Sequence, residues 1–163
     1  MFKAIKLWFT DRNYYNQRKR YMKIQKAYRK ELVKQAKDFC PWSGYYMHEM
    51  IITMLEFYHK TFSAGDCCWC EEQAVKQRAA QVEKALDYAK QLNYIDDMQL
   101  DELLHIAQKD KTGFIKYVAK MEKKLGTPIE EKMLGYVAYE YLEDKYTKAM
   151  YDTIGKHIWN WRD

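Results

Sequence analysis

The chain has 163 residues, of which 48% are hydrophobic and 16% aromatic. This composition supports a packed core in a single domain and excludes a disordered chain. Only two residues are Pro and six are Gly, and good helix formers are common, so we expect an all-α bundle of about six helices. No apolar run approaches the roughly 18 residues of a membrane span, and the first residues do not form a secretory signal. We therefore expect an intracellular protein.

Charge is distributed unevenly along the chain. Residues 1–40 carry 12 Lys and Arg against 3 Asp and Glu, whereas residues 41–163 carry 16 against 20. Like charges gathered on one segment repel each other unless an anionic surface opposes them. We therefore expect residues 1–40 to form a basic arm and helix within the single domain 1–163, packed on the bundle or extending from it, with an acidic partner.

The first helix is predicted over about residues 14–38, where apolar residues recur at spacings of three, four and seven. Six lysines fall at intervals of three and four along the same stretch, which places them on one face about 27 Å long. This predicted binding face comprises Lys19, Lys23, Lys26, Lys30, Lys34 and Lys37. Nearby tyrosines are candidate aromatic contacts, namely Tyr14, Tyr15, Tyr21 and Tyr28.

Further helices are predicted by apolar periodicity and by the residues between them. We expect them over about residues 42–62, 71–92, 97–108, 113–125 and 128–161. Thr112 is the expected N-cap of the fifth helix, and Gly126 is expected to close it. The last helix should begin with the capping box Thr127–Glu130, which has Pro at the first helical position.

A short motif at the start of the second helix has a familiar form. The sequence from Ala36 to Tyr46 contains Pro41, Trp42 and Ser43, and an apolar helix, a linker and a third helix follow as far as Leu92. This stretch resembles a loose group of small helical proteins of tailed bacteriophages, in which a Pro-Trp-Asp-Tyr element opens a hydrophobic helix. Ser43 stands where the group usually has Asp. The resemblance implies a virus-encoded protein in the host cytoplasm or the virion, and it implies no catalytic residues.

Two Glu-x-x-His elements raise the alternative of a dimetal enzyme. On a helix, residues three apart share a face, so a carboxylate and an imidazole can meet one metal ion, as in ferritin-like di-iron bundles. Such a site would combine these elements with one Glu from each of two other helices, giving the set Glu31, Glu56, His59, Glu83, Glu102 and His105. The pattern at residues 100–107 places Glu102 and His105 away from the apolar stripe, which favours surface positions for both.

A zinc site is the other metal alternative, because Cys67 and Cys70 form a Cys-x-x-Cys pair. Cys68 lies between them, and His59 lies about two helical turns before them. A single such pair is a weak zinc pattern, and plain thiols in a helix connection are the favoured explanation. We therefore expect no cofactor.

Phosphate-binding loops and nucleophile elbows are absent from the sequence, because its glycines are isolated and its only two serines lie outside such a context. The basic helix therefore carries the functional expectation. We expect a non-enzymatic protein that binds an acidic protein surface or a second copy of itself. Non-specific binding of nucleic acid remains an alternative, since lysines contact phosphates and tyrosines stack on unpaired bases.

Overall fold

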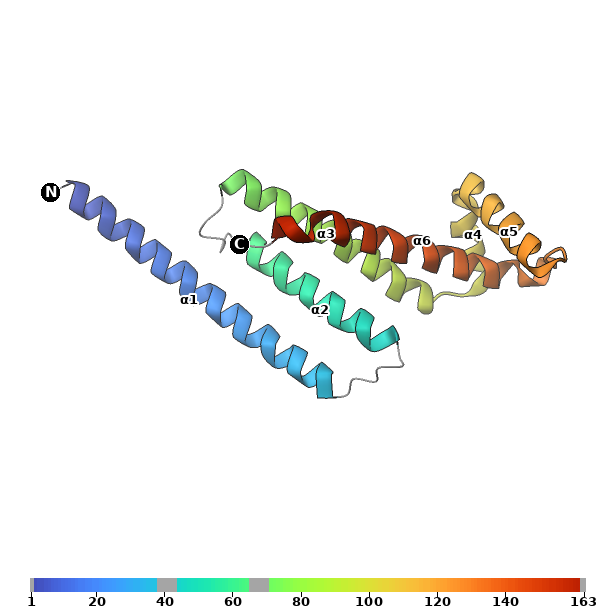
Figure 1. Cartoon of the computed structure of the whole chain (residues 1–163), viewed down its shortest axis with the longest axis horizontal. Helices are drawn as coiled ribbons and strands as arrows, with labels where there is room; N and C mark the ends of the chain where they lie inside the picture. The colour runs from blue at the N-terminus through green and yellow to red at the C-terminus, as the bar shows by residue number, and fades with distance from the viewer. Residues whose placement is uncertain (1, 38–43, 65–70, 162–163) are drawn as a thin grey trace. The chain divides into compact units, whose positions relative to one another are not determined.

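The computed structural model describes residues 2–37, 44–64 and 71–161. These residues form six α-helices, joined by turns and two short 3-10 helices, and no strand (Figure 1). The expected all-α fold, with a long N-terminal and a long C-terminal helix, is confirmed. The helices are α1 (Phe2–Lys37), α2 (Gly44–Ser63), α3 (Glu72–Asp96), α4 (Leu100–Lys109), α5 (Lys111–Leu125) and α6 (Leu134–His157), with η1 (Glu131–Met133) and η2 (Ile158–Trp161).

Contacts divide the chain into two compact units. The single domain expected from the sequence stays a prediction. Unit 1 comprises residues 1–86 and 153–163, and unit 2 comprises residues 87–152. The helices α3 and α6 each contribute residues to both units.

Unit 1 has a core built by α2, α3 and η2. Leu55 and Phe62 of α2 pack with the buried face of α3 and with Trp161 of η2. The Trp161 ring lies 5.9 Å from that of Tyr58, and its indole N–H donates a 3.2 Å hydrogen bond to Gln81. Burying a Trp with its N–H satisfied is favourable, so these contacts anchor the C-terminal residues to the helix pair. The α3 residues in this core are Val75, Val82, Ala85 and Leu86.

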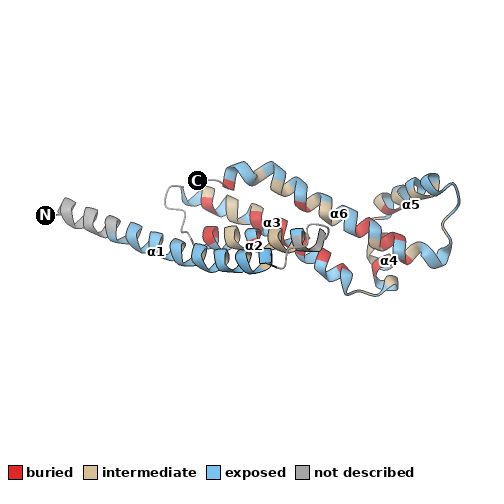
Figure 2. Ribbon diagram, turned by 60° about the horizontal axis from the view of Figure 1, so that its bottom comes forward, coloured by how far each residue is buried: buried red, intermediate tan, exposed pale blue. Residues whose placement is uncertain are grey.

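The first helix of unit 1 begins twelve residues earlier than the sequence predicted, at Phe2 rather than near Tyr14. Residues 2–13 contain neither Pro nor Gly, so nothing in their backbone chemistry stops the helix. The 36 residues of α1 exceed the 20 of α2. As a result, α1 lies beside α2 through its C-terminal half and extends beyond it at the N-terminal end (Figures 1 and 2).

Unit 2 packs α4 and α5 with the end of α3 and most of α6. Leu103 and Ala107 of α4 are buried, as their spacing predicted. The ring of Tyr141 in α6 lies 5.5 Å from that of Phe114 and 5.4 Å from that of Tyr117. These aromatic contacts fix α5 against α6.

The start of α5 corrects one expected cap. Asp110, not Thr112, is the N-cap, because its carboxylate accepts a 3.2 Å hydrogen bond from the Gly113 amide. The same carboxylate accepts hydrogen bonds from the Tyr141 hydroxyl, at 2.6 Å, and from Lys145. Asp110 is therefore the cap because Tyr141 and Lys145 of α6 bind its carboxylate, and Thr112 has no such partners.

Of the two predictions for the connection after α5, the one for Gly126 is confirmed and the one for the capping box at Thr127–Glu130 is wrong. Gly126 ends α5 in the left-handed conformation, with φ 74°. No helix begins at Thr127, however, and α6 starts only at Leu134, after η1. The Ile129 amide instead donates a 3.1 Å hydrogen bond to Glu122 of α5. This bond holds the segment after Gly126 against α5, and it takes the place of the predicted capping box.

Candidate functional site

The six lysines predicted to form a binding surface lie on one exposed face of α1, which we call the lysine face (Lys19, Lys23, Lys26, Lys30, Lys34 and Lys37). The half-buried residues of α1 include Ile24, Tyr28 and Leu32. At 3.6 residues per turn, the centres of the two sets are about 160° apart around the helix axis. The lysine face is thus directed away from α2 and into solvent. Figure 2 shows that most described residues of α1 are exposed.

The opposite face of α1 holds the helix on α2. The rings of Tyr21 and Tyr28 lie 6.3 and 5.5 Å from that of Phe57, and the Gln35 amide donates a 2.7 Å hydrogen bond to Thr53. Burial, with a smaller contribution from the carboxylate of Glu56, raises the pKa of Tyr28. These side chains serve packing within unit 1.

The four candidate tyrosines are therefore divided between two roles. Tyr21 and Tyr28 lie on the α2 side, away from the lysines. Tyr15 is 66% exposed, and Tyr14 is 38% exposed. Of the four, only Tyr15 combines high exposure with a helical position next to the lysine face, so these four tyrosines do not together form the aromatic surface expected for base stacking.

Within the described residues, the lysine face has a single ion pair, from Lys34 to Glu31 at 4.0 Å. Both side chains are more than half exposed, at 75% and 51%, and such pairs contribute little energy. The other lysines of this face form no ion pair in the described part of the chain. Their charges are therefore available to an external anion.

The carboxylates and imidazoles of the dimetal alternative are not brought together. In the described ranges, no group of three or more His, Cys, Asp or Glu could hold a metal ion. Glu102 and His105 are exposed on α4, as the apolar stripe predicted. His59 lies 3.5 Å from Ser63, one turn along α2. The remaining members, Glu31, Glu56 and Glu83, are exposed.

The zinc alternative lies outside the described residues, since these exclude Cys67, Cys68 and Cys70. The same holds for Pro41, Trp42 and Ser43 of the bacteriophage-like motif. None of the described helices is long and apolar enough to cross a membrane.

Sequence reasoning missed a second basic helix, α5. Its 15 residues contain five lysines and one acid, Glu122. The overall acidity of residues 41–163 hid this local charge, and counting charges over one helix length would have revealed it. These lysines form no ion pair with the described residues. They are Lys111, Lys116, Lys120, Lys123 and Lys124.

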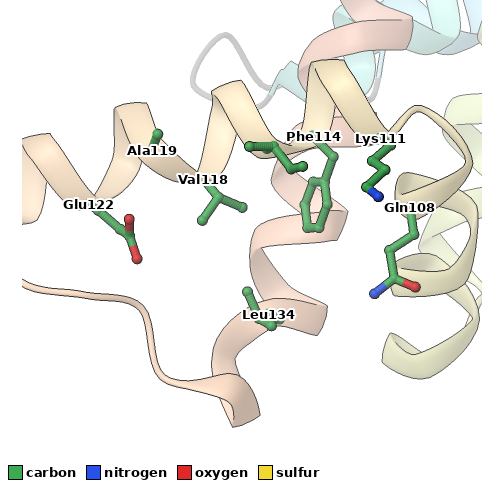
Figure 3. Close-up of a pocket in the computed structure, with 8 residues that line it drawn as sticks. Gln108, Lys111, Phe114, Val118, Ala119, Glu122 and Leu134 are labelled. Atoms are coloured by element: carbon green, nitrogen blue, oxygen red, sulfur yellow. The ribbon is translucent and has the colours of Figure 1, made fainter.

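An apolar groove of about 560 Å³ runs along α5 in unit 2 (Figure 3). Its walls come mainly from α5, with Gln108 of α4 at one end and Leu134 of α6 across from α5. The apolar lining consists of Phe114, Ile115, Val118, Ala119 and Leu134. Lys111 lies at one end of the groove and Glu122 at the other.

Acidic side chains of unit 2 gather around Glu143. Tyr117 donates a 3.2 Å hydrogen bond to Asp144, and Tyr139 donates a 2.7 Å bond to Asp96. Burial raises the pKa of Glu143, and the neighbouring carboxylates, Asp96 first among them, raise it further. The chain therefore carries both basic and acidic surfaces.

The sequence matches no known protein family and no curated protein, and the fold matches no solved structure.

Proposed function

We propose that this protein is a non-enzymatic interaction protein that binds an acidic protein surface through the lysine face of α1. The observation that carries the proposal is the exposure of six lysines opposite the face that packs on α2, with only one weak ion pair among the described residues. Separation of the two faces lets α1 bind a partner without losing its contacts to α2.

Two features favour a protein partner over nucleic acid. Binding of single strands combines cations with aromatic side chains that stack on bases, but Tyr21 and Tyr28 pack against Phe57. Lysines also dominate the face, with Arg12 on the same side of α1, and Lys lacks the bidentate geometry of Arg for reading base edges. Tyr15 is the residue that supports the nucleic-acid alternative, because it is exposed beside the lysines.

The resemblance to small bacteriophage proteins supports a virus-encoded protein as part of this proposal. A phage-encoded interaction protein in the host cytoplasm or the virion would be a virion component, an assembly factor or an inhibitor of a host defence. A second copy of the chain is also a possible acidic partner, through the surface that contains Asp96, Glu143 and Asp144.

Fluorescence anisotropy with labelled poly-L-glutamate and labelled oligothymidylate tests the proposal at low salt. Replacing Lys23, Lys26, Lys30 and Lys34 with Glu should weaken poly-glutamate binding by about 100-fold, since charge complementarity becomes repulsion. These side chains are exposed, so the circular dichroism spectrum and thermal unfolding should not change.

The matched control reverses four exposed lysines outside both α1 and α5, which changes the net charge by the same amount: Lys84, Lys90, Lys148 and Lys156. We expect this variant to lose less than about tenfold, because long-range charge is screened over roughly 10 Å. Equal losses in both variants would show that net charge alone drives binding. Tighter binding of oligothymidylate than of poly-glutamate would favour nucleic acid as the partner.

A further inference from the structure

The groove along α5 has the dimensions of a binding site for a short helix. From Lys111 to Glu122 it follows α5 for about 16 Å, or three helical turns. Ile115 is 55% exposed and Ala119 is also exposed, so apolar surface lies open along its length. Removing that apolar surface from water would favour binding.

The charges around the groove select the partner's sign. Lys111 lines one end, and at 100° per residue Lys116 and Lys123 follow on the side of α5 next to Ala119. None of these lysines forms an ion pair with any described residue. Glu122 is the one acidic lining residue, and it already accepts the Ile129 amide. The unopposed charge beside the groove is therefore positive.

We propose that the α5 groove binds an acidic amphipathic helix of a partner protein, whose apolar face enters the groove and whose carboxylates meet the lysines of α5. Helix-in-groove recognition uses apolar anchors at positions i, i+3 or i+4, and i+7, and three turns of groove accommodate three such anchors. This site is separate from the lysine face of α1, so the two proposals fail independently.

The open shape favours a helix over a compact small molecule. A drug-sized ligand is usually buried over most of its surface in an enclosed cavity, whereas this groove exposes one wall, including Ile115, to solvent along three turns. The lysines beside the groove also disfavour the N-terminal segment of a second copy as the occupant, because that segment carries Lys3 and Lys6.

The test uses three synthetic helical peptides of about 15 residues, labelled for fluorescence anisotropy and titrated with the full-length protein. The first has Leu at the anchor positions and Glu on its other faces. The second replaces Leu with Ser, and the third replaces Glu with Lys. We expect saturable 1:1 binding of the first peptide, and binding at least tenfold weaker for the other two.

Variants of the protein locate the site. Ile115→Gln removes an exposed apolar wall residue, and Ala119→Trp fills the groove from a position that is exposed. Each should weaken binding of the Leu-Glu peptide by about tenfold or more, the usual effect of losing one apolar anchor. The matched control is Leu125→Gln, which changes an apolar residue of α5 that is 59% exposed and outside the groove. It should leave the affinity unchanged.

Several results would overturn the proposal. Absence of saturable binding of the first peptide would do so, as would equal affinity for the Lys peptide or an equal loss in Leu125→Gln. A dimer of the purified protein that becomes monomeric in Ile115→Gln would assign the groove to a second copy instead. Ala119→Trp gives a second readout if Ile115→Gln lowers the thermal stability.

Discussion

The two lysine-rich helices of this protein differ in what accompanies their charge. On α1, six lysines occupy a face directed away from the packing face, whereas on α5 the lysines adjoin an apolar groove. A charged convex face attracts many anionic partners and gives little shape selection. A groove with apolar walls buries additional surface of the partner and fixes the position of the partner's apolar side chains. The same residue type can therefore support a general electrostatic contact at one site and a selective contact at another.

The largest expected difference between the two sites is in how strongly their binding affinities depend on salt concentration. Exposed charges are screened as ionic strength rises, while apolar burial is not. We expect poly-glutamate binding through α1 to weaken by about 100-fold between about 0.05 M and about 0.3 M salt, and peptide binding in the α5 groove to weaken by less than about tenfold. Parallel anisotropy titrations measure both, and equal salt dependence would remove the distinction between the sites.

The spacing of apolar residues correctly predicted helices that pack on their neighbours through one apolar face. The stripe of α4 is an example, because Leu103 and Ala107 are buried as expected. The left-handed Gly126 was predictable too, since a Gly that follows a helix favours that conformation. The shared face of the α1 lysines followed from spacing alone.

Features that depend on tertiary partners were not predictable in this way. Thr112 and Asp110 are both acceptable caps by local chemistry, and Asp110 is selected by Tyr141 and Lys145, more than 30 residues away. The capping box at Thr127 is replaced by a hydrogen bond between Glu122 and Ile129. The α5 groove likewise requires Gln108 and Leu134 from two other helices, and no local pattern places them together.

The next test weakens the packing of α1 on α2 without changing the charge of α1. Phe57 contacts the rings of Tyr21, Tyr28 and Tyr58, and it is half-buried. Phe57→Ala should lower the free energy of unfolding by about 2 kcal/mol, below the range for fully buried Phe. Hydrogen exchange should accelerate in α1 and not in α5. The control Phe114→Ala should show the reverse, and uniform acceleration in both helices would contradict the separate attachment of α1 and α5.

A smaller effect is expected at the C-terminal end of α5. Gly126 adopts φ 74°, and an added Cβ would meet no atom within 4 Å. Gly126→Ala should therefore cost only backbone strain, about 1 kcal/mol in the free energy of unfolding measured with denaturant. Gly155 lies inside α6 without a positive φ and with open space around it, so Gly155→Ala should stabilise by a similar amount. Changes of the same sign would show that φ does not decide the outcome.

The smallest change in the free energy of unfolding at neutral pH is expected for a substitution of Asp110. Its effect should appear only under acid conditions. Its hydrogen bonds from Lys145, Tyr141 and Gly113 lower the pKa of this carboxyl from 3.8 to about 2. Because the folded-state pKa is lowered, the carboxylate contributes stability that is complete above about pH 4 and is lost as the pH falls toward 2. Asn caps helices about as well as Asp, and the ion pair with Lys145 is 41% exposed on both sides, so Asp110→Asn should change little at pH 7.

Denaturant unfolding of the wild type and Asp110→Asn at a series of pH values from 7 to about 2 measures this contribution. The wild type should lose more stability than the variant between pH 4 and 2, so the two curves, which lie close together at pH 7, should separate at the acid end. The hydrogen bond from Gln35 to Thr53 that joins α1 to α2 has no titrating partner, so hydrogen exchange in α1 should not distinguish the two proteins in this range. A variant that keeps the full acid dependence would show that other carboxyls carry it, and that Asp110 does not fasten α5 to α6.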